Sequence, residues 1–373
     1  MECLMPEISS VYIPENLPVS RMAPRPAALR QPNYEERYDY KMLFADIFRY
    51  NDKIILSGPP LLNLKQIMET AKFYVDFKLT FGVPHFQDID RTQNSYIHHQ
   101  GDAYTLSIDC GWIAAEKNIQ PNYSEFFRNS KVLFTMSKDN DLQWIRDWCE
   151  FYIKVHGVDS ILLYDNNSET YTINDIVDSL KQVSGLQKIA VVNFPIKYGL
   201  ISYNRSAWDS DFAVYIQLQH ARYRFLSLAA GVINADIDEL VLTDDGRTVF
   251  DYLQEADNGY IRYKGIWVEP ATEINPKSEI RHRDCFYILN EERNPPIYRK
   301  WSADFRKLPE KVQARVHECY PDVTIEPIEG LHIRHFKGIS TGWKRDTSGI
   351  EFNPDIHKKD ELLYETYKKI GWV

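Results

Sequence analysis

The residues with the clearest chemical potential are two aspartates, Asp236 and Asp238, which directly follow the apolar run 231–235. In an extended chain, side chains two residues apart point to the same face. The pair can therefore converge on one cation while Ile237 points back into the core. A hard divalent ion held by few carboxylates completes its shell with water and phosphate oxygens. The motif predicts a Mg²⁺ or Mn²⁺ site for a nucleotide diphosphate.

The Asp-x-Asp spacing alone is not specific, because the sequence contains three further copies of it. The alternative interpretation of residues 236–238 is a buried strand that ends in a solvated acidic turn. This copy is distinguished by apolar runs on both sides and by a preceding amphipathic helix with regular apolar spacing. The other pairs are Asp88/Asp90, Asp139/Asp141 and Asp209/Asp211, and the apolar positions of the helix are Val214, Leu218, Ala221, Phe225 and Leu228.

Short polar side chains follow two other predicted strands. Residues 137–140, which include Ser137 and Lys138, come after the strand expected over 132–136, and residues 165–168 follow the strand expected over 160–164. Ligands of parallel sheets bind at the carboxyl ends of the strands, so we expect both segments and the aspartate pair to face one crevice. Asp165, Asn167 and Ser168 would read a base or a ribose. The alternative is an ordinary turn, since these residue types favour turns.

Two residues near the end of a strand expected over 260–269 could contact a second substrate. Glu269 is positioned to act as a general base on an acceptor hydroxyl, or it is a surface residue before Pro270. Trp267 would stack against an acceptor sugar, although a core position is the usual one for tryptophan.

The segment 330–338 concentrates imidazoles and cations. His332 and His335 would face opposite sides of a strand, so at most one of them should bind the same metal ion. Lys337, Lys344 or Arg345 would neutralise a diphosphate leaving group.

The regular part of the chain predicts an α/β fold. Strands over 132–136, 160–164 and 188–194 alternate with helices over 142–155 and 173–183, which indicates a parallel sheet covered on both faces. Before it we expect a proline-rich arm (residues 1–34) and an α+β module (35–128). The module would have strands over 53–56 and 104–108 and a helix near 64–78. Residues 129–373 would form the larger domain.

Composition restricts the function further. The 373 residues are 44% hydrophobic and 26% charged, with a net charge of −9, which argues against a general nucleic-acid binder. No apolar run of membrane-spanning length and no signal peptide are evident. Five cysteines without CxxC pairs favour a reducing, cytoplasmic setting, and peripheral membrane association stays open. Glycine-rich dinucleotide and P-loop motifs and the Gly-x-Ser-x-Gly elbow do not occur.

Four sequence segments resemble GT-A-fold glycosyltransferases, and more narrowly glycosyltransferase family 92 and its bacterial and viral relatives. They are WIRDWCEFYIKVHG (144–157), LLYDNNS (162–168), ADIDEL (235–240) and HFKG (335–338). The resemblance covers about residues 130 to 345. It implies a GT-A (Rossmann-like) mixed, mostly parallel sheet flanked by helices. It also implies inverting transfer of a sugar from a nucleotide-diphosphate sugar, such as a UDP-sugar, to a glycan hydroxyl with Mn²⁺ or Mg²⁺.

The resemblance also implies roles for single residues. Asp236 and Asp238 would bind the metal with His335 as third ligand, and Asp165 would read the nucleotide. Two other classes remain as alternatives, a sugar nucleotidyltransferase and a catalytically silent carbohydrate-binding protein. The complete set of expected site residues is Glu269 as catalytic base, Trp267 for the acceptor, Asp236, Asp238 and His335 for the metal, and Ser137, Lys138, Asp165, Asn167, Ser168 and Lys337 for the nucleotide.

Overall fold

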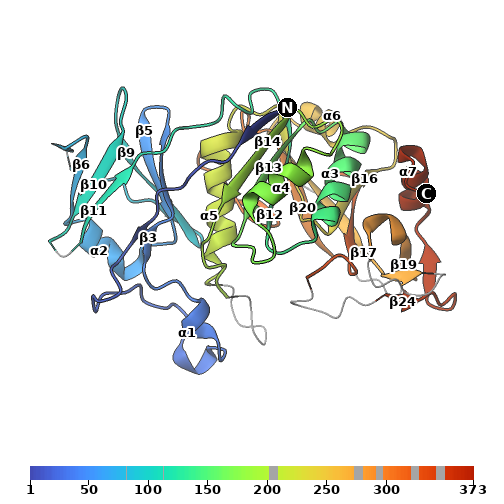
Figure 1. Cartoon of the computed structure of the whole chain (residues 1–373), viewed down its shortest axis with the longest axis horizontal. Helices are drawn as coiled ribbons and strands as arrows, with labels where there is room; N and C mark the ends of the chain where they lie inside the picture. Colours follow the sequence, from blue (N-terminus) through green and yellow to red (C-terminus); the bar gives the residue numbers. More distant parts are fainter. Residues whose placement is uncertain are drawn as a thin grey trace.

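The computed structural model describes residues 1–80, 82–111, 113–200, 209–272, 280–290, 297–320, 327–341 and 349–373, with the side chains of 297–299 left out. A β-rich N-terminal region lies beside an α/β region that is built around one large sheet (Figure 1). Within the described residues the chain forms seven α-helices. The expected α/β class is therefore confirmed.

The large sheet has nine strands in the order β1-β14-β13-β12-β15-β20-β17-β23-β16. Neighbours from β1 to β15 are parallel, as are β17 and β23, whereas β20 is antiparallel to both its neighbours and β16 is antiparallel to β23. The sheet is thus mixed and mostly parallel, as expected. Its strands are β1 (Glu2–Leu4), β12 (Lys131–Ser137), β13 (Ser160–Asp165), β14 (Lys188–Asn193), β15 (Gly231–Asn234), β16 (Glu239–Thr243), β17 (Tyr260–Val268), β20 (Ile297–Ala303) and β23 (Leu331–Phe336).

Helices cover both faces of this sheet. The two predicted crossover helices are confirmed, although the second ends three residues earlier than expected. Asp141 caps the first by accepting a hydrogen bond from the backbone N–H of Gln143, and Gly157 ends it at φ 68°, which are favourable residue types for those positions. The helices are α3 (Leu142–His156), α4 (Ile173–Leu180), α5 (Phe212–Ala221), α6 (Val249–Glu255) and α7 (Glu361–Ile370).

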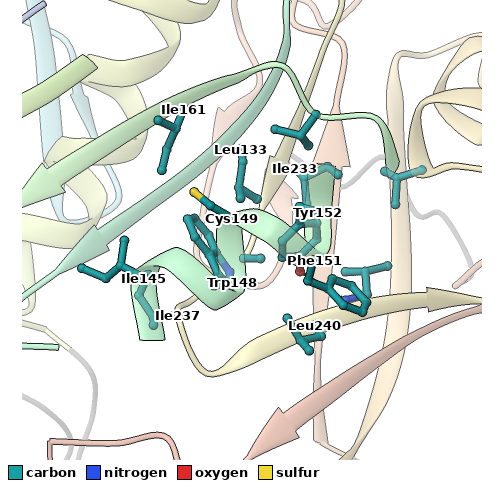
Figure 2. Packing of buried hydrophobic residues seen from close by; sticks show 14 of the residues in the cluster. Leu133, Ile145, Trp148, Cys149, Phe151, Tyr152, Ile161, Ile233, Ile237 and Leu240 are labelled. Carbon is teal, nitrogen blue, oxygen red and sulfur yellow. Dashed lines mark hydrogen bonds between the residues drawn. The ribbon is translucent and has the colours of Figure 1, made fainter. Parts of the chain in front are cut away.

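One hydrophobic core lies between the sheet and the helices α3, α4, α6 and α7, which cover one of its faces. Figure 2 shows Trp148 and Tyr152 of α3 together with Leu133 and Ile233 of the sheet. Ile237, between the two aspartates of the motif, belongs to the same core and is 3% exposed. Burial of this side chain anchors the turn that carries the aspartates.

Helix α5 covers the opposite face and differs from its prediction. The sequence predicted an amphipathic helix, but the polar residues Gln217, Gln219 and His220 are as buried as the apolar ones. The reason is that α5 also packs against β5 (Lys53–Gly58) and β9 (Thr92–His98) of the N-terminal region. It continues as a π-helical turn, Arg222–Leu226.

The N-terminal region contains two four-stranded antiparallel sheets. The strands expected over 53–56 and 104–108 are present, but the helix expected over 64–78 is wrong. Within that range only Leu64, at the end of a 3₁₀ turn, and α2 (Lys65–Met68) are helical, and the rest forms a β-hairpin whose turn has positive φ values at Asp76 and Phe77. The strands are β4 (Asp46–Tyr50), β5 (Lys53–Gly58), β8 (Asp88–Ile89) and β9 (Thr92–His98) in one sheet, and β6 (Lys72–Val75), β7 (Lys78–Leu79), β10 (Thr105–Asp109) and β11 (Ala114–Asn118) in the other.

The proline-rich arm is extended and attached to both regions. β1 adds a parallel edge strand to the large sheet beside β14, and β2 (Val11–Tyr12) pairs with β3 (Met42–Phe44). All five cysteines are free thiols. Among the described helices, none has the length and apolar character needed to span a bilayer.

Candidate functional site

The aspartate pair lies in a tight turn between β15 and β16, and the backbone N–H of Glu239 donates to the Asp236 carbonyl at 3.0 Å. The expectation of an extended chain is therefore wrong, since β15 ends at Asn234. The expected direction of Ile237 into the core is confirmed. Both carboxylates remain accessible, with side chains 52% exposed at Asp236 and 28% at Asp238.

Neighbouring elements fix the backbone of this turn. His282 donates from Nε2 to the Ile237 carbonyl at 2.8 Å, and the Phe336 N–H donates to the Asp238 carbonyl at 2.8 Å. Burial lowers the pKa of His282, which keeps its ring neutral with the proton on Nε2. The turn is thus held by segments far away in the sequence.

A compact charge cluster surrounds the turn. Lys300 of β20 places Nζ 2.8 Å from Asp236 Oδ2 and 3.0 Å from Glu239 Oε2. Glu239 Oε2 also accepts from the Asp236 N–H at 2.9 Å. His335 places Nε2 2.9 Å from Asp238 Oδ2. The sequence prediction missed Lys300 and Glu239, although the acid directly after the motif was a signal for Glu239.

The cluster changes the proton affinities of its members. Burial acts to lower the pKa of Lys300, but the charges of Asp236 and Glu239 outweigh it and raise that pKa. For His335, burial again acts to lower the pKa, and the Asp238 carboxylate raises it overall. Burial raises the pKa of Glu239 against the opposing charge of Lys300. The cluster therefore favours a charged lysine beside Asp236.

The donor atoms of the turn suit a hard divalent ion only in part. The described residues contain no group of three His, Cys, Asp or Glu side chains arranged to hold a metal. However, Asp236 and Asp238 each use only Oδ2 in the contacts found in the described part of the chain. Two such carboxylates fit Mg²⁺ or Mn²⁺ when water and phosphate oxygens supply the remaining ligands.

A row of side chains continues from the turn along β17 and β23. The Trp267 and His335 rings lie with centroids 4.1 Å apart and an interplanar angle of 30°. Beyond them Lys337 donates to the buried carboxylate of Glu269. The structure thus brings the expected acceptor residue and the expected base to the same side as His335, but it pairs Glu269 with Lys337.

The two histidines of this segment lie at different places, as the strand geometry predicted. His335 is opposite Glu239, whereas His332 is opposite Leu242 and contacts Asp244 at 2.9 Å. Only His335 therefore reaches the turn. Lys344 and Arg345, the other cations considered for the diphosphate, lie outside the described residues.

The remaining expected residues form a second group at the ends of β12 and β13. Asp165 accepts from the Ser168 hydroxyl at 2.5 Å and from its N–H at 3.2 Å, and burial raises the pKa of Asp165. Ser137 accepts from Asn140 at 2.9 Å. In the sheet, β12 lies between β13, which ends at Asp165, and β15, which precedes the turn. Asp165 and the turn are therefore separated by two strand spacings, about 10 Å.

The loops around this second group line an open cavity of about 550 Å³. Asn167, in the loop after β13, has a left-handed φ of 62°. Lys138, in the loop after β12, forms an exposed ion pair with Glu169 at 3.0 Å. A cavity of this size suits a nucleoside. Its lining residues are Asp139, Asp141, Leu142, Trp144, Thr170, Tyr171 and Thr341.

The competing Asp-x-Asp copies have partners that stabilise structure. Asp139 Oδ1 accepts from the N–H groups of Glu169 and Thr170, and Asp141 caps α3. Arginines hold most of the others, with Arg25 paired to Asp209 and Arg91 paired to Asp90 and Asp211. The turn pair is also paired, with Lys300 and His335, but it differs from these copies in lying directly after β15 of the large sheet.

A mixed α/β sheet with carboxylates and polar loops at its strand ends is typical of nucleotide-binding α/β enzymes. The family model for glycosyltransferase family 92 matches residues 133–369, which is more than half of the chain, and the chain belongs to this family. Membership implies a glycosyltransferase with a nucleotide-sugar donor and a glycan acceptor. None of the curated proteins compared with the chain matches it.

The family match includes both groups of candidate residues. It begins in β12, within a few residues of the boundary expected at 129, and ends in α7, beyond residue 345 where the sequence resemblance was expected to end. The division of the chain into an arm, a module and a larger domain stays a prediction.

Proposed function

We propose that this protein is a metal-dependent, inverting glycosyltransferase of GT-A type. It would move a sugar from a nucleotide-diphosphate sugar, with UDP as the first candidate, to a glycan hydroxyl in polysaccharide or glycan synthesis, in the cytoplasm. The observation that carries the proposal is the exposed Asp236–Asp238 turn. It lies at the strand ends of the large sheet and within the region that matches the family.

The group at the ends of β12 and β13 and the group at the turn would bind different parts of the donor. Asp165 and Ser168 do not line the 550 Å³ cavity, but Ser168 accepts from the N–H of the lining residue Asp139 at 2.8 Å, and both residues would contact a nucleoside bound there. Asp236 and Asp238 would hold Mn²⁺ or Mg²⁺, and His335 would join them on leaving its contact with Asp238. When bound, the ion supplies positive charge that stabilises the departing diphosphate.

The row along β17 and β23 would serve the acceptor. Trp267 offers a partly buried ring beside the turn, and Glu269 is a carboxylate held by Lys337. If the donor diphosphate attracts Lys337, Glu269 loses its partner and becomes available to take the proton of the attacking hydroxyl. The same lysine would thus couple donor binding to activation of the base.

A panel of nucleotide sugars tests the proposal. The protein is incubated with each donor in Mn²⁺ or in EDTA, and released nucleoside diphosphate and pyrophosphate are measured separately. We expect Mn²⁺-dependent nucleoside diphosphate release from at least one donor. Release of pyrophosphate instead would indicate a nucleotidyltransferase.

Three aspartate variants localise the activity. Asp236→Ala and Asp238→Ala should each abolish release without unfolding the protein, because neither side chain is buried at the turn. Asp178→Ala is the matched control, since that side chain is 70% exposed on α4. Normal turnover in either turn variant would contradict the proposal.

A further inference from the structure

A buried lysine side chain, Lys300, contacts the Asp236–Asp238 turn. The Lys300 side chain is only 4% exposed, and its ammonium bridges Asp236 and Glu239 at 2.8 and 3.0 Å. It comes from β20, which lies between β15 and β17 in the sheet. The lysine is therefore fixed by the strand pairing and contacts one of the two carboxylates that would hold a divalent ion.

Glu239 keeps the ammonium in this position. Its carboxylate is 4% exposed, accepts from the Asp236 N–H and contacts Lys300. A buried ammonium that leaves its carboxylates would be desolvated and unpaired, which is unfavourable. An incoming divalent ion therefore meets a positive charge that cannot move away easily, and like charges at short range repel each other.

We propose that Lys300 is a tethered counter-cation that competes with the divalent ion for Asp236. It weakens ion binding to the nucleotide-free protein. A nucleotide diphosphate adds negative charge beside the cluster, compensates for this repulsion and makes binding of the ion and the nucleotide cooperative. Lys300 is thus a positioning residue that ensures that the ion enters mainly with the donor. The inference rests on the proposed function, because it assumes that the turn holds the ion.

Metal binding without nucleotide tests the inference directly. MnCl₂ is titrated into the full chain by calorimetry, first alone and then in saturating UDP. We expect UDP to tighten Mn²⁺ binding to the wild-type protein by about tenfold or more, and Mn²⁺ to tighten UDP binding equally, since the coupling is reciprocal. Lys300→Met should bind Mn²⁺ alone about tenfold more tightly than wild type, with a correspondingly smaller effect of UDP.

Three further variants separate charge from folding. Lys300→Gln removes the charge but keeps a donor toward Asp236, and it should also bind Mn²⁺ alone more tightly than wild type. Lys300→Arg keeps the charge and should bind Mn²⁺ as wild type does. Lys264→Met removes an exposed lysine of the neighbouring strand β17 and should also leave Mn²⁺ affinity unchanged. Circular dichroism and thermal melting identify the folded variants.

The inference is overturned if folded Lys300→Met and Lys300→Gln bind Mn²⁺ alone no more tightly than wild type. An Mn²⁺ affinity of the wild-type protein that UDP leaves unchanged would contradict the proposed metal-diphosphate site as a whole, and with it this inference. Failure of the proposed function has a different signature, namely no nucleoside diphosphate release from any donor. The Mn²⁺ titrations therefore test whether Lys300 weakens Mn²⁺ binding without depending on turnover.

Discussion

The pairing of Glu269 with Lys337 gives the proposed base a specific test. Glu269→Gln keeps the size of the side chain but removes the group that would accept a proton. We expect kcat to fall by roughly 10²- to 10⁴-fold, the usual contribution of a general base. The affinity for UDP with Mn²⁺ should not fall, because Glu269 lies outside the group of residues expected to hold the ion and the nucleotide, and the variant frees Lys337 for the diphosphate.

The matched control for this variant is Glu365→Gln. Glu365 also pairs with a lysine, Lys368, but on the exposed face of α7. It should leave kcat unchanged. If Glu269→Gln turns over normally, another group takes the proton and Glu269 serves only to hold Lys337.

At the residue scale, local sequence could predict the turn but not its surroundings. The apolar runs around Asp236 and Asp238 are visible in the sequence, and so is the strand that carries His335. Lys300 and His282 have no such signal. They reach the turn through strand pairing and through a contact across 45 positions of the chain. Neither arrangement leaves a local pattern.

At the element scale, the alternation of strands and helices between residues 131 and 193 was predictable because the apolar residues of each element are regularly spaced. The helix expected near 64–78 failed, since a hairpin with left-handed residues at Asp76 and Phe77 replaced it. The all-round burial of α5 also escaped prediction. It depends on the N-terminal region packing onto the helix, which the helix sequence alone does not encode.

The end of α3 provides a pH prediction at this scale. His156 is fully buried, donates from Nε2 to the Val241 carbonyl of β16 at 2.8 Å and accepts from the Val249 N–H of α6. Burial lowers the pKa of His156 to about 4. The unfolded chain has the ordinary value of about 6.5, so protonation favours unfolding below that pH.

The stabilisation by neutral His156 is complete above about pH 6.5 and is lost as the pH falls toward 4, by about 3 kcal/mol at most. Urea unfolding at a series of pH values measures it. His156→Gln should lose less stability than wild type over this window. His98→Gln, at a side chain 65% exposed, is the control and should follow wild type. Parallel curves for wild type and His156→Gln would contradict the assignment.

At the scale of the whole molecule, one buried carboxylate joins the arm, the N-terminal region and the large sheet. Asp46 accepts from the Ser9 N–H, from His220 at 2.8 Å and from Arg224 at 2.7 Å. His220 in turn contacts the Tyr164 hydroxyl of β13 at 2.8 Å. Asp46, His220 and Arg224 are fully buried. We therefore expect the two regions to unfold as one cooperative unit.

Asp46→Asn tests that unit. The change leaves the buried guanidinium of Arg224 without its counter-charge, which should cost about 3–5 kcal/mol of the free energy of unfolding. Chemical denaturation measures this loss, and the wild-type protein should unfold in a single transition. Asp52→Asn, at a side chain 60% exposed, is the control and should change little. A loss below about 1 kcal/mol at Asp46 would show that the network does not join the regions.

The central claim is that the Asp236–Asp238 turn binds a nucleotide diphosphate through a divalent ion. Calorimetry of UDP binding in Mn²⁺ and in EDTA, with wild type and Asp238→Asn, tests it most directly. We predict that Mn²⁺ tightens UDP binding to the wild-type protein by about tenfold or more and that Asp238→Asn removes this difference. Equal UDP affinity with and without Mn²⁺, or an unchanged Mn²⁺ effect in the variant, would contradict the claim.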